Sequence, residues 1–222
     1  MMKRKLATLL TLTMLLTPAA LAATQEEAQN TAQALVGTEA TLTKLELDDG
    51  YYEFDFQDAN SRYEVTVNAG TGAACKLETK RLNVQKAASA VLDEAAARAA
   101  AQEAAPEATL HYAVLEKDDG RYEWNVFYSE GSVYGICSVQ AETGELYATE
   151  VFYGMPEGAM TADQAVEALV AAKGELTIRE LDLELDDDTG AYTYEGKAEL
   201  NGTVYEFELD AVSGSIFEWE RD

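Results

Sequence analysis

The chain contains a single histidine, His111, and this limits the chemistry that its side chains can support. A metal site built on histidine needs further ligands of the same kind, and the sequence has no second histidine to offer. A Ser-His-Asp arrangement needs only one histidine, but no Gly-x-Ser-x-Gly nucleophile turn occurs in the chain. His111 lies in a strand-like run between Leu110 and Tyr112, so we expect a solvent-facing or partly covered strand residue.

Carboxylates are abundant, with 41 Asp and Glu residues. The acidic clusters at 48–49, 118–119 and 186–188 lack the alternating ligand spacing of an EF-hand calcium loop. A carboxylate pair for hydrolysis is defined in space, so no pair can be chosen from the sequence. We therefore expect a non-enzyme without a cofactor or a metal. A hydrolase with an unrecognised carboxylate pair is the alternative, and a cleft with converging acids would favour it.

The formal charge of −25 excludes some partners. A field of this sign repels nucleic acid and anionic lipid and favours solubility. The apolar content of 47% is too high for a disordered acidic tail. These values indicate a folded protein that does not bind nucleic acid.

Residues 1–23 have the pattern of a secretory signal peptide. Lys3, Arg4 and Lys5 precede an apolar run over residues 6–16, and Ala20-Leu21-Ala22 forms a small-x-small cleavage site. No cysteine follows the run, so a lipoprotein anchor is not indicated. We expect cleavage, export and no membrane span in the mature chain.

An eight-residue phrase that occurs three times defines the architecture. Its copies begin at Val65, Cys137 and Phe207 and end at Gly72, Gly144 and Gly214, at offsets of 72 and 70 residues. Each copy has two alternating apolar residues followed by a polar turn that ends in Gly. The pattern predicts a strand that enters a tight turn in each of three similar units.

The elements before each phrase also repeat. Thr24 and Thr161 open capping boxes before Ala-rich helical segments. The middle segment lacks this Thr, and Ser89 is the candidate cap of a slightly longer helix there. Acidic turns at 48–50, 118–120 and 187–190 predict hairpins between strands. The fold class is therefore α+β: three tandem repeats, each one helix packed on a four-stranded antiparallel sheet, over residues 24–81, 89–153 and 160–222.

These elements resemble the PepSY domain. The resemblance consists of a helix, a Tyr-x-aromatic strand and an apolar-x-apolar-Asp-Ala-x-[Thr/Ser]-Gly phrase. It covers nearly the whole mature chain, although Asn68 and Gln140 replace the aspartate that the third copy keeps at Asp210. PepSY domains occur in propeptides of thermolysin-type secreted peptidases, where they act as intramolecular chaperones and inhibitors. The resemblance implies a secreted binding or regulatory protein whose partner is a protein or peptide, such as a secreted peptidase. An envelope-associated structural module without inhibitory activity is the alternative.

The second repeat departs from its siblings on one strand face. Tyr134 and Ile136 stand where the first repeat has Arg62 and Glu64. Apolar residues at such places mark a covered surface. Packing between repeats is the favoured interpretation, and a docking face for a partner is the functional alternative.

Two cysteines, Cys75 and Cys137, remain after export to an oxidising compartment. A disulfide between them is one alternative. However, Cys137 occupies an inward-facing position of the repeated phrase, which favours a buried thiol.

Overall fold

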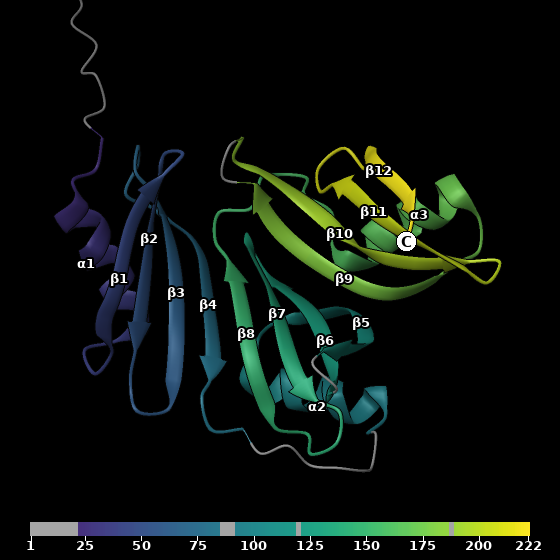
Figure 1. The fold of residues 1–222 in the computed structure, drawn as a ribbon, viewed down its shortest axis with the longest axis horizontal. Coiled ribbons are helices and arrows are strands. Elements are labelled where there is room, and N and C mark those ends of the chain that lie inside the picture. The colour runs from purple at the N-terminus through teal and green to yellow at the C-terminus, as the bar shows by residue number, and fades with distance from the viewer. Residues whose placement is uncertain (1–21, 85–91, 119–120, 187–188) are drawn as a thin grey trace, which may run out of the picture.

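The computed structural model describes residues 22–84, 92–118, 121–186 and 189–222. The predicted signal peptide and Ser89 lie outside these residues, apart from the last two positions of the signal peptide. Within them the chain forms one helix and four strands three times in succession (Figure 1). The first repeat consists of α1 Gln25–Val36, β1 Thr41–Asp48, β2 Tyr51–Gln57, β3 Ser61–Asn68 and β4 Ala74–Arg81. The second consists of α2 Glu94–Ala104, β5 Thr109–Asp118, β6 Arg121–Glu130, β7 Val133–Gln140 and β8 Leu146–Phe152. The third consists of α3 Ala162–Lys173, β9 Thr177–Asp186, β10 Ala191–Leu200, β11 Thr203–Asp210 and β12 Ile216–Arg221.

The helices begin at side-chain caps. Both predicted capping boxes, at Thr24 and Thr161, are complete, with reciprocal bonds to the third helical residue. The middle helix is capped by Asp93, whose Oδ1 accepts from the Ala96 N–H at 2.9 Å. The prediction of Ser89 as this cap is therefore wrong. Aspartate supplies the same acceptor one residue before the helix, where its charge also suits the helix N-terminus.

The repeated phrase has the structure that its pattern predicts. Val65, Cys137 and Phe207 are buried, and so are the apolar residues two positions later. They pack against small residues of the helices, such as Ala28 and Ala97, which allow the helix to approach the sheet closely.

The turn at the end of the phrase is also shared by the three repeats. The N–H of its final Gly bonds to the carbonyl of the residue four positions earlier at 2.7 to 3.0 Å. Each of these glycines has a positive φ, between +71° and +74°. In the first and third repeats, Asn68 and Asp210 use the same Oδ1 atom to accept from two backbone N–H groups of the turn.

The prediction of three separate four-stranded sheets is correct only for the third repeat. β4 and β8 pair antiparallel, with Leu77 opposite Val151, and join the first two repeats into one sheet of order β1-β2-β3-β4-β8-β7-β6-β5. Pairing satisfies main-chain groups that two separate sheets would leave open at their edges. The third repeat forms its own sheet of order β12-β11-β10-β9.

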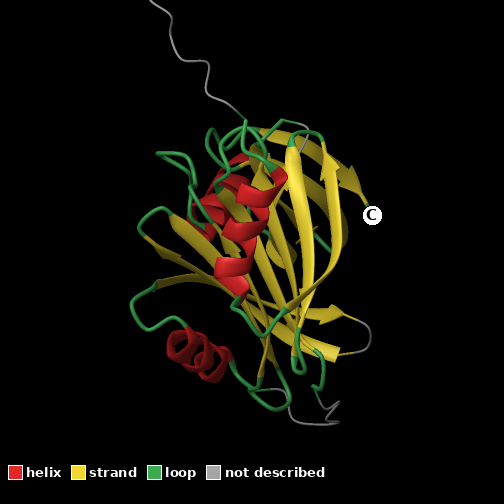
Figure 2. Cartoon of the chain, turned by 90° about the vertical axis from the view of Figure 1, so that its left-hand side faces the viewer, coloured by secondary structure: helices red, strands yellow, loops and turns green. Residues whose placement is uncertain are grey.

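The third repeat packs on the second. α1 and α2 cover one face of the eight-stranded sheet, and the third repeat lies against the other face of β5–β8 (Figure 1). The largest apolar cluster is shared by the two repeats and includes Phe127 and Phe152 of the second and Tyr194 and Leu181 of the third. In a view from the side, the helices lie against the strands of the two sheets (Figure 2). The junction of the repeats is thus part of the core.

Candidate functional site

Tyr134 and Ile136 lie inside this junction. Ile136 is only 2% exposed, and the Tyr134 hydroxyl donates to the Ala159 carbonyl at 2.9 Å. The third repeat and the segment before it therefore cover the pair, which favours packing between repeats as the reason for the apolar substitutions. The partner of this surface is another part of the same chain.

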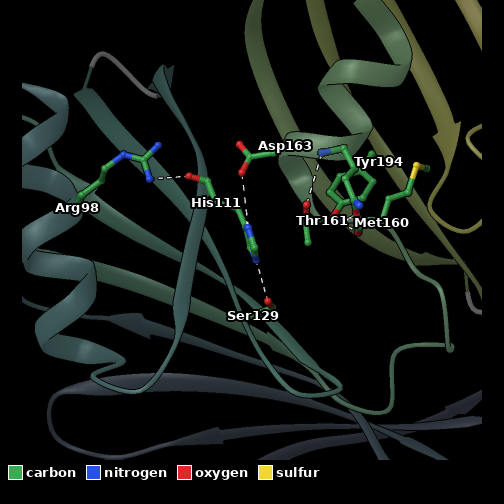
Figure 3. A network of polar contacts seen from close by, with 8 residues as sticks. Arg98, His111, Ser129, Met160, Thr161, Asp163 and Tyr194 are labelled. Carbon is green, nitrogen blue, oxygen red and sulfur yellow. Dashed lines mark hydrogen bonds and ion pairs between the residues drawn. The ribbon is translucent and has the colours of Figure 1, made fainter. Parts of the chain in front are cut away.

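His111 takes part in a Ser-His-Asp contact within the same junction (Figure 3). Its Nε2 lies 2.7 Å from Ser129 Oγ, and its Nδ1 lies 3.6 Å from Asp163 Oδ2 at the start of α3. The side chain is 12% exposed, which confirms the prediction of a partly covered strand histidine. No motif or spacing in the sequence indicates that Ser129 and Asp163 lie beside His111.

This contact lacks other features of a hydrolase triad. Ser129 lies in the β6 ladder opposite Thr109 and Tyr134, without the sharp turn that projects a nucleophile. The 3.6 Å separation exceeds a hydrogen bond between His111 and Asp163. The arrangement joins β5 of the second repeat to α3 of the third.

A polar cavity of about 350 Å³ lies between the second repeat and the third. Its walls come from β5–β8 and from β9, which runs beside β5 (Figure 1). Lys80 of β4 also reaches it. The lining residues are Lys80, Glu116, Lys117, Glu123, Asn125, Ser138, Tyr147, Ala148, Glu150, Glu180 and Asp182.

Two of the lining carboxyls have strongly shifted pKa values. Burial raises the pKa of Glu116 to about 8, with a smaller contribution from Asp182, although the Leu181 N–H donates to Glu116 Oε1 at 2.9 Å. Burial raises the pKa of Asp182 to about 7, and the nearby Glu150 raises it further. Acids with such pKa values in a cavity are the feature that the hydrolase alternative requires.

The neighbouring contacts favour a structural role for these acids. Lys76 of the first repeat pairs with Glu150 of the second at 2.9 Å and with Glu184 of the third at 3.4 Å. Burial alone would lower the pKa of Lys76, but the two carboxylates raise it above its ordinary value. Glu116, in turn, binds the main chain of β9. Of the cavity acids, Glu150 thus contacts the first repeat and Glu116 contacts the third.

The described residues contain no group of three or more His, Cys, Asp or Glu side chains placed to hold a metal ion. In the same part of the chain, no helix is long and apolar enough to cross a membrane.

Cys75 and Cys137 are free thiols, so the disulfide alternative is not formed. Cys137 is buried beneath α2, and burial raises the pKa of its thiol to about 11. Cys75 is half-buried in β4.

Two sheet edges remain open among the described residues. β1 ends the eight-stranded sheet and β12 ends the four-stranded sheet, whereas the inner edges β5 and β9 lie beside each other. Both open edges expose a large apolar side chain, Leu47 on β1 and Phe217 on β12. An open edge offers main-chain groups to an added strand.

The comparisons with known proteins agree with the repeat pattern. The family described as "Peptidase propeptide and YPEB domain", PepSY, matches residues 22–76, 91–149 and 159–220. No curated protein matches the chain.

Several solved structures are similar to the chain at low identity. The Bacillus megaterium YpeB C-terminal domain is 11% identical, with 90% of this chain and 98% of that one covered and a TM-score of 0.35. A candidate lipoprotein of Clostridium difficile 630 is 15% identical, with 61% and 96% covered and a TM-score of 0.33. A BLIP-like protein of Bacteroides fragilis is 20% identical, with 62% and 93% covered and a TM-score of 0.27.

The family match extends over more than half of the chain, and each matched segment holds one helix, three strands and the start of the fourth. The chain therefore belongs to the PepSY family and carries three tandem copies of its domain.

Proposed function

We propose that this protein is a secreted, non-catalytic regulator that binds another extracytoplasmic protein and restrains a peptidase in trans. The observation that carries the proposal is the match of three tandem segments to the PepSY family. The description of this family names peptidase propeptides. The predicted signal peptide over residues 1–23 supports export.

The geometry supports binding over catalysis. Glu116 and Glu150 of the cavity take part in contacts between repeats, and His111 lies between the second repeat and the third. By contrast, the open edges β1 and β12 have no described neighbour on their outer sides. A strand added there would gain main-chain hydrogen bonds from the scaffold without any rearrangement of the core.

The test uses the mature protein as bait in the culture supernatant of its source organism. Captured peptidases are then assayed with and without the free protein. We expect at least one peptidase to be captured and its activity to fall in proportion to occupancy. Capture of proteins without any inhibition would support the envelope-associated interaction module and overturn peptidase restraint. Neither capture nor inhibition would overturn the whole proposal.

A further inference from the structure

β12 presents one complete side of its main chain to solvent. The strand pairs only with β11, and the Asp222 N–H bonds to the Val204 carbonyl at 3.1 Å. Main-chain bonds alternate along an antiparallel ladder. It follows that Glu218 and Glu220 bond toward β11, whereas Trp219 and Arg221 direct their N–H and C=O groups to the open side.

On the face of β12 toward α3, Ile216 and Trp219 pack against the core, and Arg221 follows Trp219 on the same face. Trp219 stacks on Tyr205 with ring centroids 5.0 Å apart, and Lys173 Nζ lies 4.8 Å from the Trp219 centroid. A bulge in the ladder leaves Phe217 without a partner residue on β11, and this side chain is 62% exposed. Aromatic anchors that are already ordered lose little entropy when a partner binds.

The opposite face of the same strand is acidic. Glu208 of β11 lies directly between Glu195 of β10 and Glu218 of β12, so carboxylates oppose each other across the sheet. Like charges at such positions destabilise a sheet. Lys197 reaches Glu206 at 3.7 Å, but among the described residues no ion pair reaches Glu208 or Glu218. This face is therefore complementary to a cation-bearing partner.

We propose that the open side of β12 binds an extended segment of a partner protein in which apolar and basic residues alternate. Side chains of a strand alternate between its two faces. The apolar residues of the segment would contact Trp219 on the α3 side and the exposed Phe217 at the bulge, and its basic residues would pair with Glu218 and Glu220 on the outer side. The inference rests on the binding function proposed above and specifies its surface and the chemistry of the partner.

Charge disfavours a simpler occupant, which is a second copy of this chain. A second copy of this chain that paired edge to edge through β12 would place Glu218 and Glu220 near their own counterparts, which is unfavourable. The other open edge, β1, differs in carrying a lysine of its own on the outer face: Lys44 pairs with Glu46 at 2.9 Å, although Glu53 and Asp55 of β2 lie opposite these two residues. β1 therefore provides a matched control edge within the same molecule.

The binding test uses the mature protein and four capped octapeptides, with affinity measured by calorimetry. The first peptide alternates Val and Lys, and the second alternates Val and Glu. The third has the same composition as the first, but with all Val residues before all Lys residues. The fourth has the sequence of the first, with N-methyl groups on the amides that would bond to β12. We expect the first peptide to bind at least about tenfold more tightly than each of the others, since both the alternation and the main chain are needed. Equal binding of the N-methylated peptide would mean charge attraction alone and would overturn strand addition.

Variants locate the site. Phe217→Ser should lower the affinity for the Val/Lys peptide by about tenfold, whereas Leu47→Ser on the control edge should not change this affinity. The double variant Glu218→Lys and Glu220→Lys should reverse the preference toward the Val/Glu peptide. Circular dichroism confirms that each variant is folded. Equal losses in the β1 and β12 variants, or an unchanged charge preference, would overturn the assignment to β12.

The two proposals can fail separately. Phe217→Ser could abolish peptide binding while a captured peptidase is still inhibited. In that case β12 is not the site that binds the peptidase, and the proposed function stands. If the peptide binds as expected and no peptidase is restrained, the surface is correct and the proposed function is wrong.

Discussion

A lysine that leaves water requires charged partners, and Lys76 finds them in the two other repeats. Its side chain is 18% exposed and lies between Glu150 and Glu184, with its ammonium 5.3 Å from the Phe152 ring centroid. Each of these partners comes from a strand that is distant in the sequence. One residue thus adds an ionic link among three repeats that are already joined by the β4–β8 pairing and by the shared apolar core.

Replacement of this lysine should cost more stability than replacement of an exposed one. Lys76→Met leaves the half-buried Glu150 carboxylate without its cation, and we expect a loss of about 2 kcal/mol in the free energy of unfolding, below the range for fully buried pairs. Urea denaturation measures it. Lys44→Met, which removes an exposed pair with Glu46, is the control and should have no measurable effect. Adding Glu150→Gln should restore part of the loss, and a double variant no more stable than Lys76→Met would contradict the pairing.

The aspartate of the repeated phrase should act through its acceptor atom and not through its charge. Asp210→Asn keeps the two turn bonds, as Asn68 does in the first repeat, so thermal stability should stay close to that of the parent. Asp210→Ala removes both bonds and should cost about 1 kcal/mol. If Asp210→Asn remained folded but lost partner binding, the carboxylate would have a functional role that the turn does not explain.

At the scale of elements, local sequence patterns predicted the structure well, whereas the pairing of sheet edges was not predicted. The capping boxes, the hairpin at Asp49 and Gly50 and the inward phrase residues depend on neighbours in the sequence, and all formed as expected. The union of β4 with β8 and the cover over Ile136 depend on residues far away in the chain. Comparison of the repeats identified the unusual face of the second repeat, but it could not decide between an internal and an external partner.

The seam between β4 and β8 provides a prediction about these two elements. Tyr153 donates its N–H to the Cys75 carbonyl at 2.8 Å, and the alternation of the ladder then directs the Thr79 N–H toward β8. Thr79→Pro removes that donor and should cost about 1 to 3 kcal/mol. Hydrogen exchange should become faster over residues 74–81 and 146–152. Thr79→Ala keeps the N–H and is the control, and equal acceleration in both variants would contradict a seam held by this bond.

At the scale of the whole molecule, the junction between the second and third repeats concentrates carboxyl groups in a strongly acidic protein. The charged or titratable side chains around Glu116 and Asp182 come from all three repeats. They are Lys76, Lys80, Lys117, Glu123, Tyr147, Glu150, Glu180, Glu184 and Glu195. Burial favours the protonated form of both acids, so the stability of the junction depends on protons that it retains near neutral pH.

Stability should therefore fall as the pH rises through the interval from about 4 to about 8. The ordinary pKa values are 4.5 for Glu116 and 3.8 for Asp182, and the folded values are about 8 and about 7. In this interval the folded protein holds protons that the unfolded chain has released. Unfolding therefore releases protons, and a higher pH favours unfolding. After a discount for partial contact with solvent, we expect a decrease of about 1 to 3 kcal/mol between pH 5 and pH 8.5, measured by urea denaturation.

The matched variant for this pH dependence is Glu116→Gln with Asp182→Asn, which keeps the shape of both side chains and the acceptor for the Leu181 N–H. Neutral side chains need no retained protons, so the variant should equal or exceed the parent in stability at pH 8.5 and lose most of the decrease. General repulsion within a chain of charge −25 would also lower stability at high pH, but two neutralised residues would change that contribution only slightly. If the free energy of unfolding falls with pH as steeply in the variant as in the parent, the pH dependence comes from the surface charges. A flattened slope, together with slower hydrogen exchange over β9 at pH 8.5 than in the parent, would assign it to the junction.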